Sequence, residues 1–236
     1  LFAMGAPDSE AEVDAIRRSL EAESGASHDH LFTRRYSLLI FLAVSIGFFN
    51  QLSGINAILY YLNDIFRSAG FSSVSADVQA VVIGAVNLVA TLLGISLIDK
   101  VGRRTLLLVG AAGTALCLAG VAVVFHTNTH PGLVLPLLMA FIAFFAISQG
   151  AVIWVYLSEV FPTNVRSKGQ GLGSSSHWLM NAAIATAFPV IAAHSRAAPF
   201  WFFAGMMVVQ FVVVLMVYPE TKGQTLEAMS AHLGLH

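Results

Sequence analysis

The chain alternates between long apolar segments and short polar ones. Six of the apolar segments are long enough to cross a bilayer, because a membrane-spanning helix needs about 20 mostly apolar residues. Lipid offers no hydrogen-bond partners to the backbone, so we expect each segment to be a helix. The pattern therefore predicts an all-α integral membrane protein with six transmembrane helices. The six segments cover residues 36–62, 76–98, 105–125, 133–157, 169–193 and 199–218.

The opening residues are more polar and follow a different pattern. The run from Ser9 to Glu12 fits a capping box, and apolar residues then recur at helical spacing from Val13 to Leu20. This predicts a short cytoplasmic amphipathic helix, which is either a solvated surface helix or one with a regulatory or gating role. The chain is thereby divided into an opening segment over 1–30, a transmembrane bundle over 31–223 and a cytoplasmic tail over 224–236.

Composition and charge agree with a membrane protein. Of the 236 residues, 57% are hydrophobic and 11% are charged, whereas about a quarter of a typical soluble domain is charged. The net charge of −1 gives no reason to expect a nucleic-acid partner. The single cysteine, Cys117, excludes a disulfide framework within the chain, and no Cys or His spacing matches a metal site. We therefore expect no metal and no cofactor.

Basic residues lie almost entirely on one side of this six-span topology. The positive-inside rule places that side in the cytoplasm, together with both termini of this segment. It indicates a multi-pass protein embedded in the lipid bilayer of the cell membrane. Only Arg67 and Arg196 lie in the loops of the opposite side. The ten basic residues on the cytoplasmic side are Arg17, Arg18, Arg34, Arg35, Lys100, Arg103, Arg104, Arg166, Lys168 and Lys222.

The first span contains an unusual number of polar groups. Asn50, Gln51 and Asn56 lie within it, and Ser53-Gly54 interrupts it between them. Polar groups at membrane depth are costly and usually face a bundle interior or a water-filled cavity. These groups are uncharged and can both donate and accept hydrogen bonds. The first span is therefore suited to holding a polar, uncharged ligand.

A similar interruption recurs three spans later. If the six spans are two repeats of three, the fourth span is the counterpart of the first, and it contains Ser148-Gln149-Gly150. Transporter sites lie near the midplane, on discontinuous helices at matching positions of structural repeats. The correspondence predicts a 3+3 inverted repeat with a site near the two interruptions. Glycines in membrane helices also serve as packing devices, which is the alternative explanation.

Acids and arginines are combined in two cytoplasmic loops, and a further acid follows the last span. By the helix dipole alone, the charges of the 99–104 loop lie at their less favourable helix ends, so partners in other loops are expected. Acids and arginines on one face can form bidentate pairs that break when the helices separate. Simple positive-inside anchoring is the alternative. The residues of this expected ion-pair latch are Asp99, Arg103, Arg104, Glu159, Arg166 and Glu220.

Taken together, these pieces resemble the sugar porter family of the major facilitator superfamily. The resemblance rests on residues 51–56 with Tyr60-Tyr61, on the 99–104 and 159–166 loops and on Pro219–Gly223, which occur in the family's order. It implies a fold of twelve spans in two six-helix halves. This chain would be the C-terminal half and would begin mid-protein. Residues 1–30 would end the cytoplasmic helical linker between the halves, and the N-terminal half would be the partner of the bundle.

The resemblance also implies a sugar-binding site. Gln51 and Asn56 match residues that hydrogen-bond sugar hydroxyls in the family, and Asn50 stands where the family has the first of two glutamines. Tyr60 and Tyr61 resemble the family's extracellular gate. Amides pair well with hydroxyls, and indoles cover the C–H face of a sugar ring. The other positions that the resemblance assigns to the substrate site are Asn87, Trp154, His177, Trp178 and Asn181.

Each of these assignments also has a structural alternative. An asparagine in a membrane span, such as Asn87, can be an interhelical hydrogen-bonding residue. His177 can be a satisfied core histidine, and the two tryptophans can be packing residues. Tyr60 and Tyr61 can belong to an interfacial aromatic belt.

The expected function is transport of a monosaccharide or similar polyol by alternating access. No acid lies deep in any span, so a proton carrier would belong to the other half, and uniport and proton symport remain open. A sugar sensor with a transporter fold is an alternative, because it needs the same site. A polytopic membrane enzyme is disfavoured, since the run from Ser174 to His177 lacks an accompanying acid or oxyanion loop. The chain is therefore not expected to be an enzyme.

Overall fold

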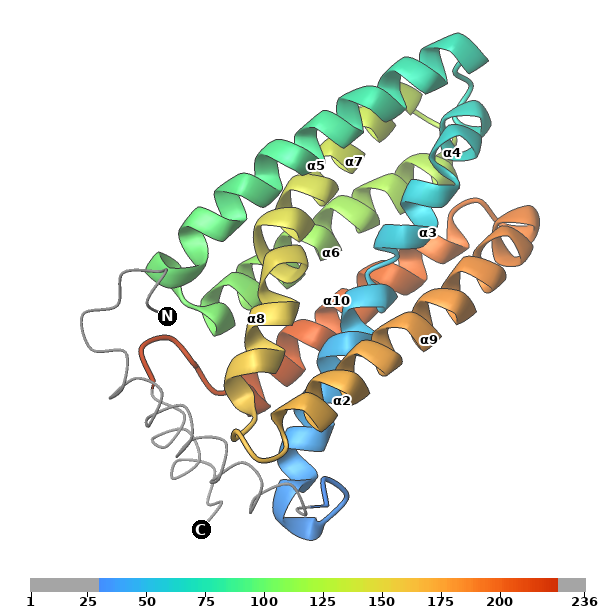
Figure 1. The fold of residues 1–236 in the computed structure, drawn as a ribbon. Helices are drawn as coiled ribbons and strands as arrows, with labels where there is room; N and C mark the ends of the chain where they lie inside the picture. Colours follow the sequence, from blue (N-terminus) through green and yellow to red (C-terminus); the bar gives the residue numbers. More distant parts are fainter. Residues whose placement is uncertain (1–29, 225–236) are drawn as a thin grey trace, which may run out of the picture.

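The structure is a computed structural model that describes residues 30–224. The described residues form a bundle of long helices joined by short loops (Figure 1). The amphipathic helix expected within residues 1–30 and nearly all of the expected tail lie outside the described residues.

All six predicted spans are confirmed, with ends within a few residues of the predicted ones. The first span consists of the 3₁₀ turn η2 (Arg34–Tyr36), α2 (Ser37–Leu52) and α3 (Ile55–Tyr60), and α4 (Leu62–Ser68) follows it. The second and third spans are α5 (Ser73–Val101) and α6 (Arg103–Thr127). The fourth consists of the 3₁₀ turn η3 (Pro131–Leu133), α7 (Val134–Phe145), the π-helical turn η4 (Ala146–Gly150) and α8 (Ala151–Val160). The fifth and sixth are α9 (Arg166–His194) and α10 (Ala198–Val217).

Two connections differ from the expected loops. The polar linker 63–75 is largely helical, because α4 continues the first span after a short kink at Tyr61. The 99–104 loop is reduced to Gly102, since α5 runs to Val101 and α6 begins at Arg103. Gly102 has a φ of 97°, a left-handed conformation that favours glycine and lets the chain reverse within one residue.

The packing of the helices follows the expected repeat. Helix α2 packs against α9, and its counterpart in the fourth span, α7 with η4, packs against α5. Helix α6 contacts α7, and its counterpart α10 contacts α2. Exchanging the first three spans with the last three therefore maps the main contacts onto one another. This is the pattern that a 3+3 inverted repeat produces.

A polar layer crosses the middle of the bundle between two apolar clusters. One cluster fills the end near Phe66 and Phe200, and the other fills the end near Tyr156 and Phe161. Buried polar groups are costly unless they are hydrogen-bonded, so their concentration at one level needs a reason. Those that lie between the two clusters along the first, third, fourth and sixth spans are Asn50, Gln51, Ser53, Thr114, Ser148, Gln149 and Gln210.

The connecting segments gather at two opposite ends of the bundle. At one end, Arg196 donates to the carbonyl oxygen of Ser68 and to Oδ1 of Asn128, which joins three loops. At the other end lie the 99–104 turn, the 159–166 loop and the segment that follows α10. Basic residues are concentrated at this second end, which is called the Arg103 end below.

Candidate functional site

The first span is interrupted where the sequence predicts it. Helix α2 ends at Leu52, and Gly54 has a φ of 80° before α3 begins at Ile55. The Ser53 hydroxyl donates to the Asn50 carbonyl at 2.6 Å and accepts from the Ile55 amide at 3.3 Å, so it satisfies backbone groups that the break leaves free. The break turns the polar side chains on either side of it toward the bundle interior.

The fourth span carries an irregularity of another kind. Residues Ala146–Gly150 form one π-helical turn instead of a break, and Gly150 keeps ordinary helical angles. Such turns insert a residue into a helix and occur frequently at functional sites. The Asn50 side-chain amide donates to the Gln149 carbonyl at 3.3 Å. The two irregular segments, expected from the repeat to lie near one site, are thus directly hydrogen-bonded.

A chain of uncharged amides runs through this region. The Asn56 amide donates to Oε1 of Gln51 at 3.1 Å, and Nε2 of Gln51 lies 3.3 Å from Oδ1 of Asn50. Nε2 of Gln51 also lies 3.0 Å from Nε2 of His177 on α9, where a neutral imidazole nitrogen can accept its second hydrogen. Three of these side chains, Asn50, Gln51 and His177, are buried. We call Asn50, Gln51, Asn56 and His177 the amide chain.

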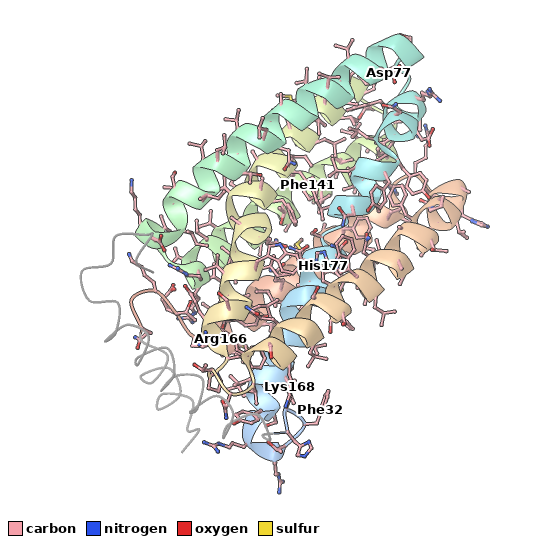
Figure 2. All side chains as sticks on the ribbon, viewed as in Figure 1. Phe32, Asp77, Phe141, Arg166, Lys168 and His177 are labelled. Atoms are coloured by element: carbon pink, nitrogen blue, oxygen red, sulfur yellow. The ribbon has the colours of Figure 1, made fainter. Side chains whose placement is uncertain are left out.

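Two indoles flank His177, the residue labelled near the middle of the bundle in Figure 2. The ring of Trp154, on α8, lies 5.3 Å from the His177 ring between centroids, and the ring of Trp178 lies 5.0 Å away. Trp154 is 46% exposed and Trp178 is 55% exposed. A tryptophan that served only to fill the core of this chain would be buried, so each indole keeps surface available beside the amide chain.

The two tyrosines lie further toward the Arg196 end. Asn181 donates to the Tyr60 hydroxyl at a long 3.5 Å, and Tyr60 is exposed. The Tyr61 hydroxyl donates to the Ala185 carbonyl, and its ring stacks on Phe188 with centroids 5.4 Å apart. The two tyrosines thus link the C-terminal end of α3 to α9, on the Arg196 side of the amide chain.

Asn87 is the one expected site residue that lies apart from this group. It is half-buried on α5, at helical spacing from the inward-facing residues Ile83, Ala90 and Gly94. Its side chain forms no hydrogen bond with another described residue. The structure places it on the inner face of α5 without connecting it to the amide chain.

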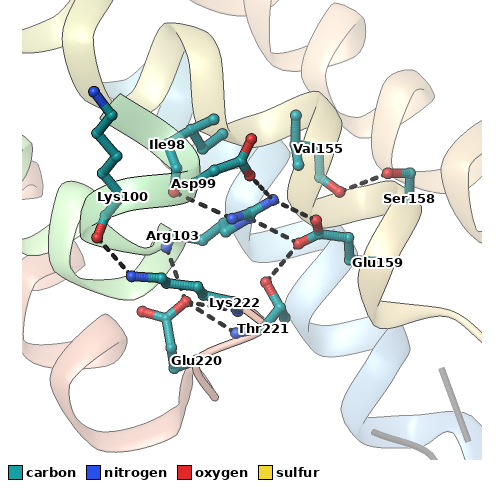
Figure 3. A network of polar contacts seen from close by, with 10 residues as sticks. All are labelled: Ile98, Asp99, Lys100, Arg103, Val155, Ser158, Glu159, Glu220, Thr221 and Lys222. Atoms are coloured by element: carbon teal, nitrogen blue, oxygen red, sulfur yellow. Dashed lines mark hydrogen bonds and ion pairs between the residues drawn. The ribbon is translucent and has the colours of Figure 1, made fainter. Parts of the chain in front are cut away.

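At the Arg103 end, one arginine holds two acids (Figure 3). Nη2 and Nε of Arg103 lie 2.6 and 2.9 Å from the two carboxylate oxygens of Glu159, which is a bidentate pair. Nη2 also lies 2.9 Å from Oδ1 of Asp99. Arg103 is buried, and Thr221 donates to Glu159 at 2.6 Å. The network therefore ties together α5, α6, α8 and the segment after α10.

Glu220 has a different partner from the one that the sequence suggests. Its carboxylate accepts the backbone N–H groups of Arg103 and Arg104 at 2.9 and 3.1 Å. These are free donors at the start of α6, where the helix dipole also favours an anion. Glu220 therefore caps α6, which relieves the unfavourable placement of the two arginines that the sequence indicated.

Arg104 and Arg166 are not paired with acids within the part of the chain that the structure describes. Arg104 donates to the Leu215 carbonyl at 2.6 Å. Arg166 donates to the Phe161 carbonyl and to the Thr163 hydroxyl, within its own loop. Both arginines thus hydrogen-bond to backbone carbonyls or within a loop. Among residues 30–224, Asp99, Arg103 and Glu159 are the members of the expected latch that form ion pairs.

Two participants were not identified from the sequence. Gln149 supplies the carbonyl that receives Asn50, and Thr221 supplies a hydroxyl to Glu159. Both lie in segments that the sequence singles out, the Ser148-Gln149-Gly150 run and the Pro219–Gly223 segment. Neither has a charge or spacing that would distinguish it from its neighbours.

Comparison with known proteins gives a consistent result. The profile of the family described as "Sugar (and other) transporter" matches residues 2–233. The chain is 35% identical to the D-xylose-proton symporter of Escherichia coli (strain K12), over 82% of this chain and 41% of that protein. It is 32% identical to the arabinose-proton symporter of Bacillus subtilis (strain 168), over 92% of this chain and 47% of that protein.

Solved structures of related transporters have the same fold as this chain. The inward open conformation of the xylose transporter XylE from E. coli superposes with a TM-score of 0.79 and 30% identity, over 98% of this chain and 47% of that one. A double tryptophan mutant of XylE superposes with a TM-score of 0.82 and 31% identity, over 94% of this chain and 48% of that one. The chain therefore spans somewhat less than half the length of these proteins.

Proposed function

Because the chain belongs to the sugar transporter family, we propose that it forms half of a secondary transporter for a monosaccharide or similar polyol. The observation that carries this proposal is the amide chain at the middle of the bundle, with exposed indoles beside it. It lies where a membrane protein would otherwise place apolar side chains. Polar groups at this depth typically mark a substrate pathway.

The chemistry of the amide chain suits a sugar. Its members hydrogen-bond to one another, so they are satisfied without a ligand. A sugar hydroxyl both donates and accepts, and can therefore replace one amide–amide bond without leaving a buried group unpaired. The indoles of Trp154 and Trp178 can cover the apolar C–H face of the ring. Uncharged contacts that can be exchanged in this way permit both binding and release.

The second half of the transporter would cover faces that this chain leaves open. Helices α5 and α9 are the least buried of the six spans and lie along opposite edges of the bundle (Figure 1). Apolar side chains such as Leu88 and Leu92 on α5 and Leu179 and Ile191 on α9 are exposed. We infer that lipid and an N-terminal six-helix half share these faces, with the Arg103 end in the cytoplasm. The halves would rock about the amide chain.

For coupling, we propose proton symport with the proton carrier in the other half. The two relatives above are named as proton symporters. In the described part of this chain, the acids lie at or near helix ends: Asp64, Asp77, Asp99, Glu159 and Glu220. None of them is placed to carry a proton past the amide chain.

Uptake by the full-length protein in proteoliposomes tests the proposal. A panel of D-xylose, L-arabinose, D-glucose and myo-inositol is supplied with and without an inward proton gradient. We expect saturable uptake of at least one sugar, with accumulation above the external concentration only when the gradient is present. Binding without uptake would identify a sensor instead. Uptake without accumulation in the gradient would indicate uniport.

A pair of tryptophan variants tests whether the sugar binds beside the amide chain. Trp154→Phe should raise the Kd for the transported sugar, because it removes the indole beside His177. Trp201→Phe is the matched control, since Trp201 has the same 46% exposure but lies on α10, away from the amide chain. Equal Kd values for the two variants would mean that the sugar does not bind at the proposed site.

A further inference from the structure

A pocket lies between α8 and α9 on the Arg103 side of the amide chain. Its volume is about 390 Å³, and it is lined by Trp154, Leu157, Gln170, Gly171 and Ser174. Small-molecule sites typically occupy roughly 300–1,000 Å³. Along α9 the pocket falls between the labelled His177 and Lys168 of Figure 2. It therefore lies next to the proposed central site, toward the proposed cytoplasmic end.

The polar residues of the pocket continue a stripe along α9. Gln170, Ser174, His177 and Asn181 follow one another at spacings of four, three and four residues, which places them on one helix face. At a rise of about 1.5 Å per residue, Ser174 is about 5 Å and Gln170 about 10 Å from His177 along the axis. Asn181 meets Tyr60 at the other end of the stripe. Hydrogen-bonding groups thus extend from the tyrosines, past the amide chain, into the pocket.

Two polar side chains of the pocket have no hydrogen-bond partner among the described residues. The side chains of Gln170 and Ser174 are both half-buried, and neither hydrogen-bonds to another described residue. Nearby Ser176, in contrast, donates to the Leu172 carbonyl of its own helix. The pocket thus offers a free amide and a free hydroxyl next to an exposed indole. The central site likewise places amide side chains, those of the amide chain, beside an exposed indole.

We propose that this pocket is a second subsite for the same neutral, polyhydroxylated ligand, on the cytoplasmic side of the central site. Trp154 contacts His177 and also lines the pocket, so one indole would serve both positions. A sugar leaving the amide chain could exchange its hydrogen bonds for those of Ser174 and Gln170 while it keeps the indole. The inference rests on the proposed transport function.

Sided transport kinetics of the full-length protein test the subsite. Ser174→Ala and Gln170→Leu each remove a free polar group from the pocket. Ser175→Ala is the matched control, because Ser175 is the exposed neighbour that does not line the pocket. With D-xylose as the probe, we expect the KM for movement out of the cytoplasmic compartment to rise about three- to tenfold in the first two variants. The KM for entry from the opposite side should change less than about twofold in every variant.

The outcomes separate the subsite from the proposed function. If the wild-type protein moves no sugar from the panel, the transport proposal fails. If it transports but the cytoplasmic KM is unchanged in Ser174→Ala and Gln170→Leu, only the subsite is overturned. An equal rise of KM from both sides would assign the two residues to the central site, which also overturns a separate subsite.

A labelling experiment does not depend on how well these variants transport. A charged thiol reagent applied from the cytoplasmic side should modify Ser174→Cys, and saturating D-xylose should slow the modification at least about threefold. Ser175→Cys serves as the control and should show no protection by the sugar. The native Cys117 is buried, so we expect it to react little with the reagent. Equal protection of the two cysteines, or none at Ser174→Cys, would overturn the subsite.

Discussion

Gln51 connects the site at the scale of single residues, because its amide contacts three other polar side chains. It accepts from Asn56, and its Nε2 faces both Asn50 and His177. These partners come from the two sides of the Gly54 break and from α9. A change at this side chain therefore affects the amide chain as a whole.

We expect Gln51→Ala to raise the sugar Kd about tenfold, which corresponds to about one to two lost hydrogen bonds. Asn63→Ala is the control, because Asn63 is an amide that donates to Asp77 at the far end of the bundle, away from the amide chain. Isothermal titration with the sugar that the full-length protein transports gives both constants. A Gln51→Ala protein that binds as tightly as wild type would remove Gln51 from the site.

Gln210 shows the opposite situation at the same level of the bundle. It is 1% exposed on α10, and its Oε1 has no hydrogen-bond partner among the described residues. A buried acceptor without a partner costs about 1–3 kcal/mol. Gln210→Met keeps a similar shape without that cost, so we expect a higher melting temperature in detergent and an unchanged sugar Kd. A lower melting temperature would show that Gln210 has a partner in the intact membrane protein.

The sequence identifies the residue types of the site but not every partner. Asn50, Gln51 and Asn56 stand out because amides are rare at membrane depth. The acceptor of Asn50 is a backbone carbonyl, that of Gln149, and every residue has one. Likewise, Glu220 accepts from backbone N–H groups where its charge suggested an arginine side chain. Hydrogen bonds to the backbone leave no trace in the pattern of side chains.

At the scale of elements, the break between α2 and α3 depends on one glycine. Gly54 has a φ of 80°, and a side chain there would meet the ring of Phe203 on α10. A left-handed conformation costs other residues about 1–2 kcal/mol, before any clash is counted. The break is therefore fixed both by its own backbone and by a neighbouring span.

We expect Gly54→Ala to lower the free energy of unfolding by about 2 kcal/mol or more and to reduce sugar binding, because Gln51 and Asn56 would lose their relative orientation. Gly205→Ala is the control, since Gly205 is helical on α10 with no atom within 4 Å of an added Cβ. Melting curves and binding isotherms of the two purified variants check this. Equal stability would mean that the break is not a rigid feature.

The elements themselves are largely predictable, for a physical reason. A span of about 20 apolar residues is needed to cross the bilayer, so each span is marked along its whole length. The sequence does not indicate the π-helical turn, because one added residue hardly changes the length or the hydrophobicity of the fourth span. Helix α4 is also missed, since its polar residues resemble those of a loop.

At the scale of the whole molecule, the polar layer and the Arg103 end are mechanically linked. Trp154 and Glu159 both lie on α8, so the helix that flanks the amide chain is also held by Arg103. The same arginine contacts Asp99 at the end of α5, while Glu220 caps α6. Movement of α8 relative to α5 and α6 would have to break the bidentate pair.

We therefore expect Arg103→Gln to change the rate of transport more than the affinity for sugar. The variant keeps the amide chain intact, so the Kd should stay within about twofold, while turnover falls about tenfold because the two conformations are no longer balanced by the ion pair. Arg166→Gln is the matched control, since among the described residues Arg166 hydrogen-bonds within its own loop, and its turnover should change little. Because removing one partner of a buried ion pair can also destabilise the fold, a second variant at Arg103 separates this effect from a change in turnover. Arg103→Lys keeps the charge but loses the bidentate geometry, and its turnover should lie between those of wild type and Arg103→Gln. If Arg166→Gln slowed transport as much as Arg103→Gln did, positive charge at this end would matter and the specific pair would not.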